Sequence, residues 1–219
     1  MVQHTAPIIS ISRHRINIDG PGIVTLVGFH GCQLNCLYCI NQFIHRATQD
    51  YKNLTGIELF QIVKIDDIYF KASKGGITFG GGEPLLYVDF IEEFYQIIRK
   101  EGWTLNIESS LNAEKREFAR LLPIVNNWII DIKDLNDSIY KRYTGASSNQ
   151  VITNLRILAE ANLQYRSLIR VPLISGFNNN ENRKKSVSIL CEMGFSRFDL
   201  FEYKTDCIMF YDKCKTLNL

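Results

Sequence analysis

Short apolar runs alternate with amphipathic segments along most of this chain, and this alternation limits the possible folds more than any other feature. Six apolar runs are predicted strands, over residues 23–29, 76–79, 103–108, 128–132, 165–172 and 197–201. Helices are predicted over 87–101, 112–122, 150–160 and 180–193, with a less periodic one over 56–72. Strands separated by helices are expected to pair in parallel through right-handed crossovers.

The number of strand–helix units decides which α/β architecture we expect. Six units are too few for a closed eight-stranded barrel. We therefore predict a partial (β/α)6 barrel with parallel strands and with the helices outside. A length of 219 residues suits one large domain, so a single domain over 1–219 is predicted. Ligands of such sheets bind at the C-terminal ends of the strands.

Composition and charge exclude several classes of protein. Apolar residues make up 46% of the chain and charged residues 22%, which are ordinary globular values. The formal net charge of +2 gives no reason to expect nucleic acid or a membrane as a partner. No apolar run reaches the roughly 18 residues of a spanning helix, and residues 1–12 do not read as a secretion signal. We expect a cytoplasmic protein, whose six cysteines are not first read as disulfides.

Three of the cysteines crowd into the loop after the first predicted strand. Cys32, Cys36 and Cys39 have the spacing C-x3-C-x2-C. Three thiolates can bind three corners of a cubane iron–sulfur cluster and leave one iron open to a substrate. A closed zinc site or a ferredoxin needs four protein ligands, and no fourth cysteine or histidine stands at a familiar spacing. The loop therefore favours a cluster with an open iron, and a zinc or redox loop is the alternative.

A glycine run with an acidic residue follows the second predicted strand, at residues 80–84 (GGGEP). Glycine lets the backbone approach a ligand closely. Glu83 brings a carboxylate to the mouth of the sheet, where it suits an ammonium group. Taken alone, the run is explained as well by a plain tight turn.

Together the two motifs resemble the radical SAM superfamily, and further segments narrow the resemblance to the glycyl radical enzyme activating enzymes. Those segments follow the family's order: residues 18–22 (IDGPG), 31–32 (GC), 76–85 (GITFGGGEPL), 131–133 (DIK), 143–145 (YTG) and 170–174 (RVPLI). The resemblance runs from about residue 16 to residue 203, which would be the core of the domain, with 204–219 as an atypical C-terminal tail.

The resemblance implies a role for each matching residue near the cluster. Cys32, Cys36 and Cys39 would ligate a [4Fe-4S] cluster, whose fourth iron would be chelated by the amino and carboxylate groups of S-adenosylmethionine. Tyr38 would lie near the adenine. The methionine amino group would be held by a group of three residues, namely Gly81, Gly82 and Glu83.

Residues at later strand ends would complete the site. Glu108 and Ser109 match an acidic–hydroxyl pair near the cofactor and a monovalent cation, to which Asp131 would contribute. Lys133 would contact the methionine carboxylate, and Arg170 would lie near the cofactor or a substrate peptide. An ordinary surface ion pair of Asp131 with Lys133, and a solvated Arg170, are the plainer alternatives.

The implied activity is reductive cleavage of S-adenosylmethionine to a 5′-deoxyadenosyl radical, which abstracts a Cα hydrogen from a glycine of a partner glycyl radical enzyme. Flavodoxin or ferredoxin would donate the electron, and the enzyme would act as a monomer. Two alternatives are a radical SAM enzyme of the same scaffold that modifies a peptide or small molecule, and a binding protein stabilised by zinc or a cluster.

The chain departs from the family pattern at a few places. Val24 stands where an arginine is usual, and Lys204, counted among the cofactor-binding candidates, stands where a histidine is common. No cysteine-rich insert follows Cys39. A second cluster formed by Cys191, Cys207 and Cys214 is not expected, because Cys191 lies on an apolar stripe and the other two are too far apart for a compact motif.

Overall fold

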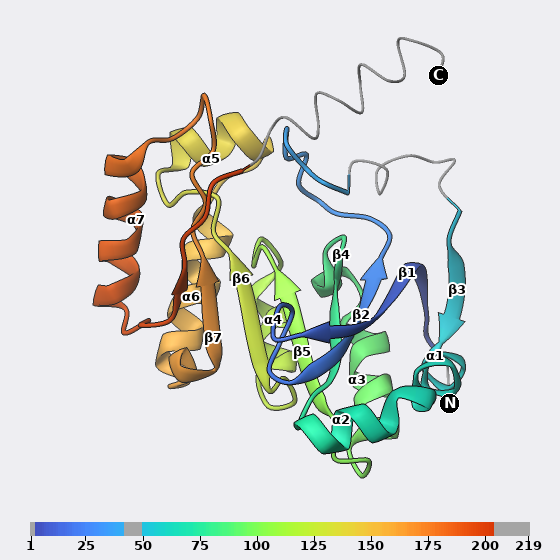
Figure 1. Ribbon diagram of the computed structural model, residues 1–219. Coiled ribbons are helices and arrows are strands. Elements are labelled where there is room, and N and C mark those ends of the chain that lie inside the picture. Colours follow the sequence, from blue (N-terminus) through green and yellow to red (C-terminus); the bar gives the residue numbers. More distant parts are fainter. Residues whose placement is uncertain (1–2, 42–49, 204–219) are drawn as a thin grey trace.

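The computed structural model describes residues 3–41 and 50–203 (Figure 1). Its strands form one sheet in the order β3-β1-β2-β4-β5-β6-β7-β8. Neighbours from β2 to β8 pair in parallel. These strands are β2 (Ile23–Phe29), β4 (Gly76–Gly81), β5 (Thr104–Ser109), β6 (Asn127–Asp131), β7 (Ser167–Arg170) and β8 (Phe198–Asp199). The six predicted parallel strands and the α/β class are confirmed.

Two antiparallel strands extend this sheet and were missed by the sequence analysis. β1 (Thr5–Ile16) pairs with β2 on one side and with β3 (Lys52–Thr55) on the other. The second half of β1 is largely exposed and contains Ser, Arg and His, so it lacks the apolar run of a buried strand. β3 has only four residues and none of them is fully buried.

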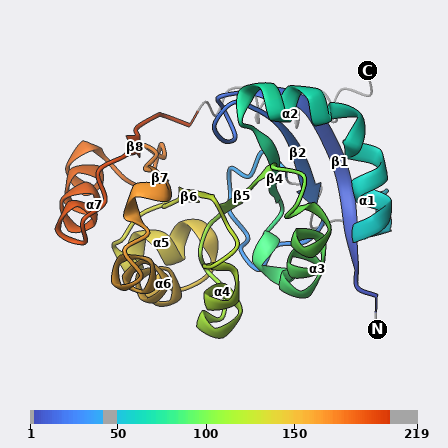
Figure 2. The ribbon, with the colours of Figure 1, turned by 90° about the horizontal axis from the view of Figure 1, so that it is seen from below.

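The helices line the outside of a sheet that curves without closing, as predicted (Figure 2). α1 (Gly56–Val63), α3 (Val88–Ile98), α4 (Lys115–Leu121) and α6 (Asn149–Glu160) each pack against the next. Aromatic rings fill the space between α3 and the sheet: Phe29 stacks on Phe79 at 5.0 Å, and Phe79 meets Phe94 edge-to-face at 5.4 Å. No helix in the described ranges has the length and apolar character needed to span a bilayer.

The helix predicted over 56–72 is interrupted. α1 ends at Val63, a 3₁₀ turn covers Lys64–Asp66, and α2 (Asp67–Ser73) follows. The turn places the Asp66 carboxylate in the interior, where it accepts a hydrogen bond of 2.8 Å from Thr25 Oγ1 on β2. A continuous helix was therefore the wrong prediction, because this buried polar contact breaks the helical period.

Helix α7 (Asn180–Glu192) differs from the prediction in the face that it buries. It buries Leu190 as expected, but its other buried residue is Ser186, whose hydroxyl accepts the Leu135 backbone N–H at 3.1 Å. Cys191 is exposed, so its explanation by core packing is wrong. Cys207 and Cys214 lie outside the described residues.

Candidate active site

The three cysteines lie on the loop that leaves β2, at the end of the sheet where the parallel strands terminate (Figure 1). All three are half-buried. A helix that the sequence analysis missed, α5 (Asp137–Thr144), anchors this loop. Its last two carbonyl groups accept backbone hydrogen bonds from the loop, at 3.2 Å from Leu37 N to Tyr143 O and 2.9 Å from Asn35 N to Thr144 O. The YTG segment is therefore structural support for the cysteine loop.

Burial controls the protonation of these thiols. It raises the pKa of Cys32 to about 12, with help from the charge of Glu83. It raises the pKa of Cys36 to about 11, although Lys133 acts in the opposite direction. Metal ligation requires thiolates, so the positive charge of bound iron must displace these protons. Within 3–41 and 50–203 no three His, Cys, Asp or Glu side chains converge on a single ion.

The glycine run packs against the backbone just before the cysteines. Gly82 N donates to Phe29 O and Glu83 N donates to Gly31 O, both at 2.9 Å. A Cβ atom on Gly82 would lie 2.1 Å from Gly31 O. Asn41, just past the last cysteine, donates from Nδ2 to Gly81 O at 2.9 Å. The close approach that glycine allows here is therefore to the cysteine loop itself.

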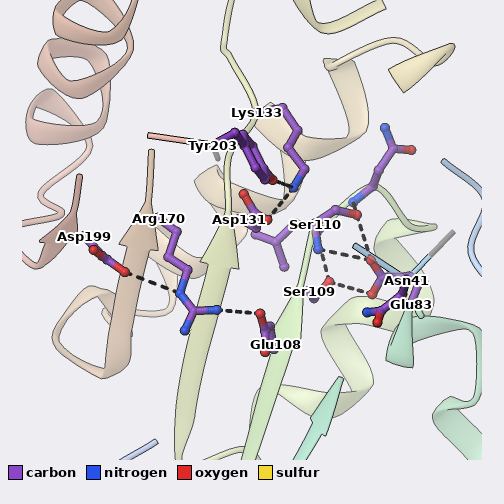
Figure 3. Close-up of polar contacts among 12 residues, drawn as sticks. Asn41, Glu83, Glu108, Ser109, Ser110, Asp131, Lys133, Arg170, Asp199 and Tyr203 are labelled. Atoms are coloured by element: carbon purple, nitrogen blue, oxygen red, sulfur yellow. Dashed lines mark hydrogen bonds and ion pairs between the residues drawn. The ribbon is translucent and has the colours of Figure 1, made fainter. Parts of the chain in front are cut away.

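Glu83 is 2% exposed, and its carboxylate is held by the end of β5. It accepts hydrogen bonds from Ser109 Oγ at 2.6 Å, Ser110 Oγ at 2.7 Å, Ser110 N at 3.1 Å and Leu85 N at 3.2 Å (Figure 3). Burial raises the pKa of Glu83, and these hydrogen bonds act against that rise. The sequence analysis placed Glu83 at the site but missed Ser110, whose only signal is its position beside Ser109.

Inside the barrel, the Arg170 guanidinium contacts three carboxylates. Its guanidinium lies 2.5 Å from Glu108, 3.6 Å from Asp199 and 3.9 Å from Asp19, and it donates to Ile18 O at 3.0 Å. Burial raises the pKa of Glu108, and the charge of Arg170 opposes that rise. The solvated alternative for Arg170 does not fit this arrangement, in which its side chain is 14% exposed.

Asp19 belongs to the segment before β2 where the chain departs from the family pattern. Val24 is fully buried and brings no charge. Another arginine, Arg15, contacts Asp19 instead, with Arg15 Nε 2.5 Å from Asp19 Oδ2. Asp19 lies in the IDGPG segment, but the sequence alone predicts no partner for its carboxylate.

Replacing Arg170 with methionine is expected to lower the free energy of unfolding by about 2 kcal/mol or more, because it leaves Glu108 without its counter-charge at a place where burial already raises its pKa. Arg120→Met is the matched control. Arg120 also contacts three carboxylates, from Asp89, Glu92 and Glu117, but on the surface, so its loss should cost less than about 1 kcal/mol. Urea denaturation measures both. Equal losses in the two variants would contradict a buried role for Arg170.

Glu108 and Ser109, two of the residues expected at a monovalent cation, do not converge. Glu108 and Ser109 are neighbours on β5, so their side chains point to opposite faces of the sheet. Glu108 contacts Arg170 inside the barrel, and Ser109 donates to Glu83 on the other side (Figure 3). The two side chains therefore do not fit a shared cation site.

Asp131 and Lys133 do come together, with Lys133 buried and Asp131 half-buried. Lys133 Nζ donates to Asp131 Oδ2 and, at 2.8 Å, to the hydroxyl of Tyr203, which the sequence analysis missed (Figure 3). Burial alone lowers the pKa of Lys133, but Asp131 and Tyr203 outweigh it and hold the pKa well above its usual value. The surface-pair alternative is excluded, because Lys133 is 8% exposed.

Tyr38 lies in an aromatic group next to the same ion pair. Its ring centroid is 6.0 Å from that of Tyr143 and 5.8 Å from that of Phe177, and Tyr143 lies 6.3 Å from Tyr203. Whether Tyr38 contacts adenine stays a prediction. Lys204 lies outside the described residues.

A loop of three cysteines at the C-terminal mouth of an open parallel barrel, with charged side chains beside it, is the arrangement expected of a barrel enzyme that binds an iron–sulfur cluster. A sequence model of the Radical SAM superfamily matches residues 26–185. The chain belongs to the radical SAM superfamily and is an enzyme of that kind. Membership implies a [4Fe-4S] cluster and S-adenosylmethionine.

Among curated proteins the chain is similar to activating enzymes. It is 25% identical to the indoleacetate decarboxylase activating enzyme of Tractidigestivibacter scatoligenes, covering 84% of this chain and 79% of that protein. It is 32% identical to the (2S)-3-sulfopropanediol dehydratase activating enzyme of Klebsiella oxytoca, covering 79% of this chain and 55% of that protein. It is 28% identical to the pyruvate formate-lyase 1-activating enzyme of Escherichia coli K12, covering 75% of this chain and 67% of that protein. The chain thus spans little more than half of the second relative.

Solved structures support the fold. Streptococcus suis SuiB bound to the precursor peptide SuiA superposes with a TM-score of 0.61 at 15% identity, covering 83% of this chain and 39% of SuiB. SuiB bound to S-adenosylmethionine superposes with a TM-score of 0.61 at 14% identity, covering 82% of this chain and 42% of SuiB. Because the sequence identities are this low, the similarity shows only that the fold is shared.

The donor set of the chain fits the cofactors that the superfamily implies. Three thiols share one loop, and the charged Lys133 stands nearby. Two buried polar atoms in the same region, Asp131 Oδ1 and the Tyr143 hydroxyl, have no hydrogen-bond partner among the described residues. Unpaired buried polar atoms are uncommon in folded proteins, so these two mark places where a ligand, an ion or a water could bind.

Proposed function

We propose that this chain is a radical SAM activating enzyme that generates a glycyl radical in a partner enzyme. The cysteine loop carries the proposal, and the similarity to three curated activating enzymes supports the choice of substrate. When bound, the cluster and S-adenosylmethionine would supply the radical that removes a hydrogen atom from the Cα of the partner's glycine. A flavodoxin or ferredoxin would be the electron donor.

The chain's own residues would bind and orient the cofactors. Cys32, Cys36 and Cys39 would hold the cluster. Lys133, fixed by Asp131 and Tyr203, would direct a positive charge at the methionine carboxylate. The amides of Gly82 and Glu83 are already used, so the glycine run would offer its carbonyl oxygens to the methionine ammonium group. The single-domain assignment over 1–219 stays a prediction.

Electron paramagnetic resonance tests the proposal. The anaerobically reconstituted protein is mixed with S-adenosylmethionine, a reductant and the glycyl radical enzyme encoded nearest to its own gene. We expect a glycyl radical signal that disappears when S-adenosylmethionine is omitted. Cleavage of S-adenosylmethionine without a radical on any such partner would contradict the activating function and favour modification of a peptide or small molecule.

A further inference from the structure

Tyr143 has a buried hydroxyl that the fold leaves unused. The residue is 1% exposed, and its hydroxyl has no hydrogen-bond partner in the described part of the chain. Its ring packs 5.1 Å from Phe177 and 6.0 Å from Tyr38, and its backbone carbonyl supports the cysteine loop. The ring and the backbone therefore have structural roles, and the hydroxyl does not contribute to them.

The surroundings of this hydroxyl are charged. Burial raises the pKa of Tyr143, so the hydroxyl remains a proton donor at neutral pH, and the charges of Lys133 and Asp131 act on it. Lys133 has three N–H donors. The described residues accept two of them, at Asp131 and Tyr203 (Figure 3), which leaves one.

Two unused donors in one region of the site, the Tyr143 hydroxyl and one N–H of Lys133, favour one kind of ligand. Tyr203 contacts both residues: its ring lies 6.3 Å from that of Tyr143, and its hydroxyl accepts from Lys133. A carboxylate has two oxygens that accept hydrogen bonds, and it binds best where an ammonium and a second donor meet. We propose that the Tyr143 hydroxyl donates a hydrogen bond to the carboxylate of S-adenosylmethionine, beside Lys133. The inference rests on the proposed function, because it needs that cofactor. It makes Tyr143 a cofactor-binding residue in addition to a packing residue.

The substitution Tyr143→Phe tests this, because it removes only the hydroxyl. We expect the unliganded protein to keep its melting temperature or to gain stability, since an unpaired buried polar atom is lost. Affinity for S-adenosylmethionine, measured by equilibrium dialysis on the anaerobic cluster-loaded protein, should fall about fivefold to tenfold. Affinity for decarboxylated S-adenosylmethionine should be the same in wild type and variant.

Tyr140→Phe is the matched control. Tyr140 is equally buried, but its hydroxyl accepts a hydrogen bond of 3.1 Å from Asn112 Nδ2. Its loss should lower the melting temperature and leave the affinity for S-adenosylmethionine unchanged.

Three results would overturn the inference while the proposed function survives. They are unchanged affinity of Tyr143→Phe for S-adenosylmethionine, an equal loss of affinity for the decarboxylated form, and a shift in cluster reduction potential without a loss of affinity. The last would assign the hydroxyl to the Cys36 thiolate. If the wild-type protein did not bind S-adenosylmethionine, the proposed function would be wrong, and this inference with it.

Discussion

The variant Cys36→Ala is expected to lose its iron–sulfur cluster and all cleavage of S-adenosylmethionine. The loop offers three thiolates to a cluster that already has one iron without a protein ligand, so a second open iron leaves it weakly held. Anaerobic reconstitution of the wild type should give about four irons per chain, and the variant close to none. Iron and sulfide analysis measures this.

Cys191→Ala is the control for that experiment. Cys191 is exposed on α7, far along the chain from the loop, and should affect neither iron content nor cleavage. Circular dichroism should show that both variants are folded. A Cys36→Ala protein with the iron content of the wild type would contradict the assignment of the cluster to this loop.

The second large effect is expected from Gly82→Ala. The new Cβ would lie 2.1 Å from Gly31 O and 2.8 Å from Phe29 O, and both are backbone atoms that cannot move independently of the cysteine loop. We expect the variant to lose more than about 3 kcal/mol of unfolding free energy, or to fail to fold. Urea denaturation of the purified protein measures the loss, and expression as insoluble protein would show the failure.

Gly80→Ala, two residues earlier in the same run, separates a specific clash from a general intolerance of side chains. A Cβ there would first meet Leu26 Cδ1 at 3.2 Å, and that is the end of a side chain that can rotate away. We expect a loss of less than about 1 kcal/mol. If Gly82→Ala were as stable as Gly80→Ala, the tight backbone contact between β4 and the cysteine loop would be wrong.

The elements that could be predicted from the sequence are those whose residues share one environment. β2, β4 and β6 are buried on both faces, so their apolar runs are nearly continuous and easy to recognise. α6 has a regular apolar stripe of Val151, Leu155 and Leu158. α5 was missed because only Tyr140, Tyr143 and Thr144 of its eight residues are buried and it is polar overall.

The residues of the candidate site likewise fall into those that could be predicted from the sequence and those that could not. Cys32, Cys36 and Cys39 are close in sequence, so their spacing reveals their joint role. Glu83 and Lys133 were found through resemblance to known motifs. Ser109 and Asp131 were named with them, but their other partners, Ser110 and Tyr203, were not. Contacts such as that of Arg170 with Ile18 join residues 152 positions apart, and no local pattern reveals them. Neither Asp199 nor Tyr203 lies in a recognisable motif, and only the folded sheet brings them to the barrel interior.

The opposite orientation of Glu108 and Ser109 follows from strand geometry. Adjacent residues look like one acidic–hydroxyl unit in the sequence, but a strand sends their side chains to opposite faces. Glu108 thus joins the charged interior around Arg170, and Ser109 supports Glu83 beside the cysteine loop. Through these two contacts, β5 connects the barrel interior on one face with the glycine run on the other.

The most direct measurement of the central claim is the product analysis of the reduced enzyme. The wild-type protein is reconstituted with iron and sulfide under anaerobic conditions, reduced with dithionite and supplied with S-adenosylmethionine. Chromatography should then detect methionine and 5′-deoxyadenosine in equal amounts, and neither product without the reductant. A fully cluster-loaded, reduced protein that forms neither product would contradict the assignment of this site to radical cleavage of S-adenosylmethionine.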